Sequence, residues 1–120
     1  MVRKMGKLRR ATNRDWIAVH GNRVAVPSQW VGLAVDGRRC LDGLGGMFLA
    51  EDDQWWAFFW RAPHVKRPLS THKAGRMIVE TAREAGVPLN VLRDDSICSS
   101  KAWLKRLGFR HVEGDQWRTQ

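Results

Sequence analysis

The stretch Trp55-Trp56-Ala57-Phe58-Phe59-Trp60 carries an apolar side chain at every position. A strand with one face in water alternates apolar and polar residues, whereas an uninterrupted apolar run indicates a strand that is buried on both faces. We therefore predict a central strand over residues 54–61, with helices above and below the sheet. Two interpretations of its tryptophans remain: they belong to the core, or some of them line a cleft or face a partner protein.

Two strands are predicted ahead of this run. The acidic turn at residues 51–53 follows a predicted strand over 40–50. Asp36-Gly37 predicts a two-residue hairpin between that strand and the apolar run at 30–35. Glycines within the second strand indicate a bulge or a close approach of the backbone, namely Gly43, Gly45 and Gly46.

The N-terminal region predicts a strand followed by a capped helix. Residues 1–6 are expected to form a flexible basic arm that leads into a strand over 7–11. Thr12 and Asp15 have the spacing of a helix N-cap, which predicts a helix over 13–20.

The segment after the central strand predicts a β-α-β crossover. A helix over 70–86 carries an apolar stripe and ends at Ala85-Gly86, the stripe being Met77, Ile78, Thr81 and Ala82. A strand over 88–92, a helix over 97–107 and a hairpin of 109–112 with 116–119 follow. The order predicts an α/β (mixed α+β) fold: a mixed central sheet with an antiparallel N-terminal meander, the crossover and helices on both faces.

Composition limits the class of protein. The 120 residues fit one domain over 1–120, and the net charge of +9 predicts attraction to nucleic acid, a phosphorylated ligand or an acidic surface. No apolar run reaches the ~18 residues of a membrane span, and no secretory signal is evident, so we expect a cytoplasmic protein. The two cysteines form no Cys-x-x-Cys pair, so no metal site is expected.

The order of these elements resembles the GNAT superfamily of N-acetyltransferases. Three segments carry the resemblance: the opening strand and helix cap at 8–15, the meander at 31–60, and the last helix at 99–109, which ends in Leu107-Gly108-Phe109. The resemblance implies a single GNAT-like domain that takes an acyl group from acetyl-CoA and transfers it to an amine by direct attack. Small members of this kind also occur in tailed phages, some of them associated with the virion.

The resemblance also implies where coenzyme A binds. In the family, a loop after the fourth strand wraps the pyrophosphate at the start of the next helix, where unpaired N–H groups and the helix dipole favour anions. Here that segment is basic, but it lacks the family's spaced glycines, and Pro68 removes one N–H donor. A solvated basic loop is the alternative interpretation. The candidate cofactor-binding residues are Trp60, Arg61, Lys66, Arg67, Ser70, Thr71, His72 and Lys73.

The candidate catalytic residues are His72, Cys98 and Ser99. The family's last helix often carries a tyrosine that protonates the leaving thiolate, and Leu104 occupies that position here. Leucine transfers no proton, so water or His72 would have to replace the tyrosine. Cys98 and Ser99 lie at the start of the predicted last helix, where the dipole favours a thiolate. An ordinary surface histidine and a buried, inert cysteine are the alternatives.

Three functional hypotheses follow. The first is an acetyl-CoA-dependent N-acetyltransferase acting on an unknown amine. The second is a catalytically inactive GNAT-fold module that binds a protein partner in a phage assembly, located in the bacterial host cytoplasm or in the virion. The third, weaker hypothesis is a nucleic-acid binder driven by the charge of +9, although no known nucleic-acid-binding motif is recognisable.

Overall fold

The computed structural model describes residues 7–65, 69–93 and 100–119. In the described part of the chain, no helix has both the length and the apolar character needed to cross a bilayer. The elements, in chain order, are β1 (Lys7–Arg10), α1 (Asn13–His20), the 3-10 turn η1 (Gly21–Arg23), β2 (Trp30–Asp36), β3 (Leu41–Leu49), β4 (Trp55–Arg61), α2 (Leu69–Glu84), β5 (Leu89–Leu92), α3 (Ser100–Leu107), β6 (Arg110–Glu113) and β7 (Gln116–Arg118).

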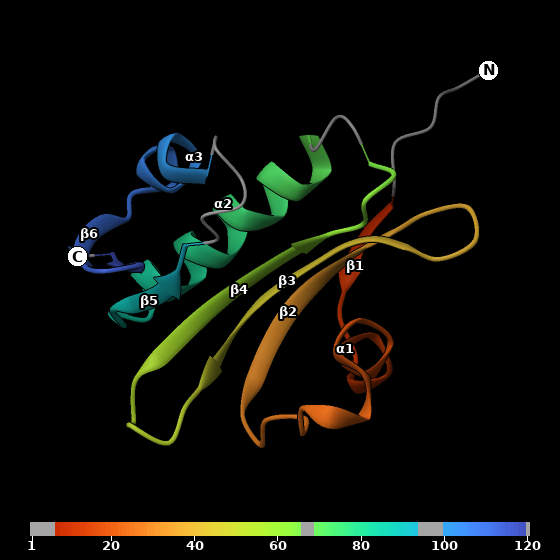
Figure 1. The fold of residues 1–120 in the computed structure, drawn as a ribbon, viewed down its shortest axis with the longest axis horizontal. Helices are drawn as coiled ribbons and strands as arrows, with labels where there is room; N and C mark the ends of the chain where they lie inside the picture. The colour runs from red at the N-terminus through yellow and green to blue at the C-terminus, as the bar shows by residue number, and fades with distance from the viewer. Residues whose placement is uncertain (1–6, 66–68, 94–99, 120) are drawn as a thin grey trace.

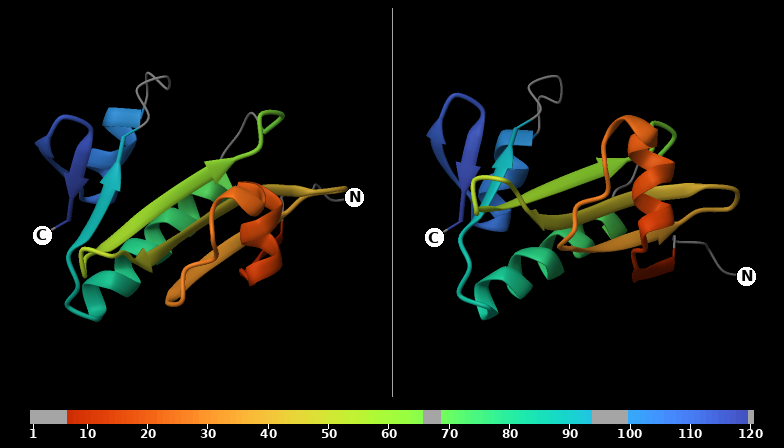
Figure 2. Two further views of the ribbon diagram at one scale, coloured as in Figure 1. Left: turned by 60° about the horizontal axis from the view of Figure 1, so that its bottom comes forward. Right: turned by 90° about the horizontal axis from the view of Figure 1, so that it is seen from below.

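The strands form one seven-stranded sheet in the order β1-β2-β3-β4-β5-β7-β6 (Figure 1). Neighbours from β1 to β4 are antiparallel, β4 and β5 are parallel, and β7 pairs antiparallel with both β5 and β6. The mixed α+β fold and the central place of β4 are therefore as predicted. Helix α1 covers one face, and α2 covers the other (Figure 2).

Helix α1 begins where its sequence predicts. The backbone N–H of Thr12 donates to the Asp15 carboxylate at 2.7 Å, which caps the first turn. Arg9 of β1 donates to both oxygens of the same carboxylate at 2.9 Å, and its Nε donates to Asp36 of β2 at 2.7 Å. One guanidinium thus joins β1, α1 and β2.

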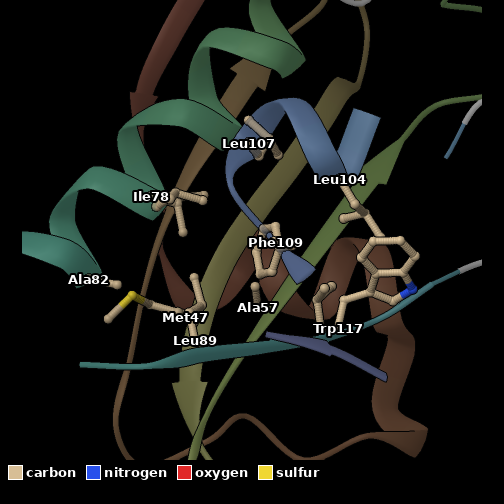
Figure 3. Close-up of a cluster of buried hydrophobic side chains, with 11 residues drawn as sticks. Met47, Ala57, Ile78, Ala82, Leu89, Leu104, Leu107, Phe109 and Trp117 are labelled. Carbon is tan, nitrogen blue, oxygen red and sulfur yellow. The ribbon is translucent and has the colours of Figure 1, made fainter. Parts of the chain in front are cut away.

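The main core lies between the sheet and the pair α2 and α3 (Figure 3). Its members are Met47, Ala57, Ile78, Val79, Ala82, Leu89, Val91, Leu104, Leu107, Phe109 and Trp117. The expected burial of the β4 tryptophans is only partial, because Trp55, Trp56 and Trp60 are half-buried. Two tryptophans outside β4, Trp16 and Trp117, are fully buried instead.

The apolar stripe of α2 differs from the predicted one. Ile78 and Ala82 are buried as expected, but Met77 is 42% exposed and Thr81 is also exposed. The helix turns its small residues inward instead, because a side chain at Gly75 would meet Trp103 and Leu107 of α3 at 3.2 and 3.3 Å. The buried face is therefore rotated toward Ala74, Gly75, Ile78, Val79 and Ala82.

Two details of the meander bear on the sequence predictions. The two-residue hairpin at Asp36-Gly37 is wrong: residues 37–40 separate β2 from β3, and the Gly37 N–H donates to the Cys40 carbonyl oxygen at 2.9 Å. The register also slips between Val35 and Asp36, next to this connection. The expected close approach is confirmed at Gly46, where a Cβ would lie 2.6 Å from the Val31 carbonyl oxygen.

Candidate functional site

Strands β4 and β5 are paired over a short length only. Their parallel register consists of Trp55 opposite Leu89 and Trp56 opposite Asn90. Beyond this junction β4 continues to Arg61, whereas β5 pairs with β7 on its other side. Figure 2 shows the two strands starting together and then separating. The two strands therefore diverge, and the later residues of β4 have no partner in β5.

Asn90 holds this junction together. Its side chain is 1% exposed, and its Nδ2 donates to the Trp55 carbonyl oxygen at 3.1 Å and to Gln54 Oε1 at 3.0 Å. Its Oδ1 accepts from Gln116 Nε2 at 3.0 Å and from Arg118 Nε at 2.7 Å. A buried amide with both ends paired fixes the spacing of its neighbours. Asn90 is not among the residues predicted from the sequence, although an asparagine inside an apolar strand indicates a buried polar contact.

The first turn of α2 has the electrostatics of an anion site. The helix contains 16 residues and has no acidic residue in its first turn, which includes Ser70 and Thr71. The first N–H groups of a helix lack intrahelical partners and carry the positive end of its dipole. Lys73 in the next part of the helix and Arg61 at the end of β4 are both exposed. Of the other predicted residues, Lys66, Arg67, Cys98 and Ser99 lie outside the described residues.

His72 is hydrogen-bonded to α3. The indole N–H of Trp103 donates to His72 Nδ1 at 2.9 Å. Because an indole N–H can only donate, Nδ1 is the unprotonated nitrogen, and the neutral ring carries its proton on Nε2. In this neutral form Nε2 can donate a hydrogen bond, whereas donation of a proton as a general acid requires the doubly protonated ring, in which the hydrogen bond from Trp103 to Nδ1 is lost.

Trp103 also links His72 to the central strand. Its ring meets Phe59 of β4 edge-to-face at a centroid distance of 5.0 Å. One indole thus joins the first turn of α2, helix α3 and the second half of β4. The next residue, Leu104, is 3% exposed and belongs to the core, so no proton donor stands at the position of the family's tyrosine.

The alternation of β4 separates two of the predicted cofactor ligands. Phe59 contacts α3, whereas Phe58 contacts Trp16 of α1 at a ring distance of 5.1 Å. Successive side chains of a strand point to opposite faces. Arg61 therefore lies on the α2 and α3 face with Phe59, and Trp60 lies on the α1 face with Phe58.

The α1 face carries an aromatic cluster that sequence analysis missed. Trp16 contacts Trp30, Phe48 and Phe58 at ring distances of 5.3, 6.1 and 5.1 Å, and His20 at 4.1 Å. Burial lowers the pKa of His20, because desolvation disfavours the charged ring. Its Nε2 is buried and has no hydrogen-bond partner in the described structure. These residues come from four separate segments, so only the fold brings them together.

The fold resembles solved acetyltransferases. A GNAT-family acetyltransferase from Staphylococcus aureus Mu50 has a TM-score of 0.58 and 10% identity over 75% of this chain. A Vibrio cholerae protein, provisionally named a ribosomal-protein-serine acetyltransferase, has a TM-score of 0.48 and 14% identity over 89% of this chain. Each match covers 66% of the solved chain. No protein-family model and no curated protein matches the sequence. The chain thus has a GNAT-like mixed α+β fold.

Proposed function

We propose that the protein binds acetyl-CoA beside the β4–β5 junction and transfers the acetyl group to an amine. The observation that carries this proposal is the two-pair register of β4 and β5, which leaves the end of β4 without a strand partner on that side. The GNAT-like fold supports this proposal. A fold alone does not decide an activity, so the residues at the junction have to carry the argument.

The first turn of α2 is the proposed place for the phosphates of coenzyme A. Backbone N–H groups there would donate hydrogen bonds to the pyrophosphate oxygens, and the exposed Arg61 and Lys73 would add positive charge. The absence of acidic residues from this turn fits an anionic ligand. Because the segment lacks the family's glycines, its backbone cannot approach the pyrophosphate as closely. We therefore expect weaker binding than a glycine-rich loop gives.

The proposed reaction is direct acyl transfer. The amine nitrogen attacks the thioester carbonyl carbon, a C–N bond forms, and the C–S bond breaks. Backbone N–H groups of β4 beyond Trp56 would stabilise the developing negative oxygen. The departing thiolate takes a proton from water, or from Nε2 of a His72 ring whose Nδ1 has first been protonated at the cost of the hydrogen bond from Trp103, and the amine releases its own proton to solvent. Cys98 and Ser99 remain candidates for the same proton transfer.

Titration calorimetry with acetyl-CoA tests the binding step. We expect saturable heat at millimolar ligand or below, and weaker binding for the double variant Arg61→Gln/Lys73→Gln. The matched control is Arg38→Gln/Arg39→Gln, which removes the same charge from exposed positions in the β2–β3 connection. Absence of both heat and a thermal shift at millimolar acetyl-CoA would reject the proposal.

The second candidate function is a catalytically inactive GNAT-fold module that binds a protein, such as a component of a phage particle. The specific observation that favours it is the pair of residues at the proposed reaction centre. Trp103 packs against Phe59, and the buried Leu104 takes the place of the family's proton donor. Co-purification with one stable partner, together with no acetyl-CoA turnover, would favour this function over the first.

A further inference from the structure

A pocket lies on the C-terminal side of the molecule, between α3 and the β6–β7 hairpin. It has a volume of about 450 Å³, within the range of small-ligand sites. Phe109 and Trp117, both buried, form its inner wall. Its exposed rim carries Lys101, Lys105, Arg110 and His111. We call this the basic pocket. None of the described residues that line it is acidic.

The inner wall contains an unsatisfied donor. Trp117 is 3% exposed, and its indole Nε1 has no hydrogen-bond partner among the described residues. In Figure 3 the nitrogen lies at the edge of the ring, away from the aliphatic side chains of the core. A buried indole N–H can only donate, and leaving it unpaired costs about 1–3 kcal/mol.

The rim supplies uncompensated charge. Lys101 and Lys105 are four residues apart and share one face of α3, and Arg110 begins β6. Within the described part of the chain, none of the three forms an ion pair with a carboxylate. Cations gathered around a concave surface raise the local concentration of anions, and a ligand with at least two negative charges matches them best.

The basic pocket is separate from the site proposed for acetyl-CoA. Trp103 and Leu107 of α3 face Gly75 of α2. Lys101 and Lys105 lie on another face of the same helix and line the pocket toward the hairpin. An occupant of this pocket therefore binds on the side of α3 that is turned away from α2.

We propose that the basic pocket binds a phosphate group carried by a small molecule. A phosphate monoester brings nearly two negative charges and three acceptor oxygens, whereas a carboxylate brings one charge. The cations surround a single hollow instead of following an extended groove, which favours a small ligand over a nucleic-acid strand. The rim cations would neutralise the charge, and the Trp117 indole in the inner wall lies close enough to report a bound ligand. This inference goes beyond acyl transfer and does not depend on it.

Titration calorimetry and NMR test the proposal, with pyrophosphate and ADP as probes. The two probes separate a site for the bare anion from one that also needs a nucleoside. We expect saturable binding of at least one probe and a shift of the Trp117 indole N–H signal. Lys101→Gln/Lys105→Gln should weaken binding by about tenfold or more, since two charge-assisted contacts are lost. The control Arg38→Gln/Arg39→Gln removes the same charge elsewhere and should change binding less than about twofold.

Assignment of the indole signal uses Trp117→Phe, which keeps an aromatic ring. If that variant does not fold, single substitutions of the other tryptophans assign the Trp117 signal by elimination. Three results would overturn the proposal: no saturable binding of either probe at millimolar concentration, equal losses in the two charge variants, or binding of a single-stranded oligonucleotide alone. Displacement of pyrophosphate by equimolar acetyl-CoA would show that the two ligands share one site. Failure of acetyl-CoA to bind would contradict the proposed acyl transfer but not the proposed phosphate site.

Discussion

The indole N–H of Trp103 and Nδ1 of His72 are 2.9 Å apart, and this hydrogen bond decides which ring nitrogen of His72 carries the proton. Protonation of Nδ1 would break the bond, so the neutral Nε2–H form is the one that the fold selects. The position of the histidine at the start of α2 thus depends on a residue 31 positions further along the chain.

The tautomer of His72 is directly measurable. Nitrogen-15 NMR of the imidazole should show the Nε2–H form in the unmodified protein. Trp103→Phe keeps the ring contact with Phe59 but removes the donor, so we expect a mixture of tautomers in that variant. An unchanged tautomer in Trp103→Phe would contradict the proposed role of the indole.

Substitution of Asn90 should destabilise the protein strongly. Asn90→Ala removes both ends of a buried amide and leaves the Trp55 carbonyl oxygen and the Arg118 guanidinium without this partner. We expect a loss of about 2–4 kcal/mol in the free energy of unfolding, measured by urea denaturation.

The control for Asn90 is Asn13→Ala, which removes an exposed hydrogen bond to Trp30. Exposed side-chain hydrogen bonds contribute less, so we expect a loss below about 1 kcal/mol. Equal effects of the two substitutions would show that the junction is not specially dependent on its buried amide.

Acid should weaken the contact between β1 and α1. Hydrogen bonds from Arg9 lower the pKa of Asp15 to about 2, so the folded chain binds this proton less readily than the unfolded chain. The free energy of unfolding should therefore fall as the pH drops from about 4 to about 2. Asp15→Asn should lower the free energy of unfolding by about 1–2 kcal/mol at pH 7 and should reduce its fall between pH 4 and pH 2, as measured by denaturation at several pH values. If the free energy of unfolding of Asp15→Asn falls as steeply in acid as that of the unmodified protein, Asp15 is not the group responsible.

His20 predicts a second pH dependence at milder acidity. Because burial lowers its pKa, the unfolded chain binds a proton at a higher pH than the folded chain does. Stability is then complete above about pH 6.5 and declines as the pH falls below that value. His20→Phe keeps an aromatic ring in the cluster and should reduce the decline between pH 7 and pH 5. Thermal melts across that range would show whether the decline survives the substitution.

The sequence predicted best where the signal is local. The apolar run at 55–60 indicated a central strand, and Thr12 with Asp15 indicated the start of α1, because both signals act within one element. The inward face of α2 was harder to predict, since Ala74 and Gly75 are buried by the approach of α3, and residues that small give a weak hydrophobic period.

The candidate site depends on contacts between residues that are far apart in the sequence. His72 was a sequence candidate, but its bond to Trp103 joins α2 to α3, and the pairing partners of Asn90 lie 26 to 36 positions away. Likewise, Trp117 and Lys101 meet at the basic pocket only because β5 is flanked by β7. The spacing of residues within one helix or strand could not have predicted these contacts.

The short register between β4 and β5 divides the sheet mechanically. Four strands on one side and three on the other are joined by two residue pairs, by the side chain of Asn90 and by a hydrogen bond from Arg118 of β7 to Gln54. A slight rotation of the C-terminal trio about that joint would change the angle between the two halves and break no other strand pairing. A bulkier residue at position 75 of α2 would meet Trp103 and Leu107 of α3, so we expect it to push α3 away and to change this angle.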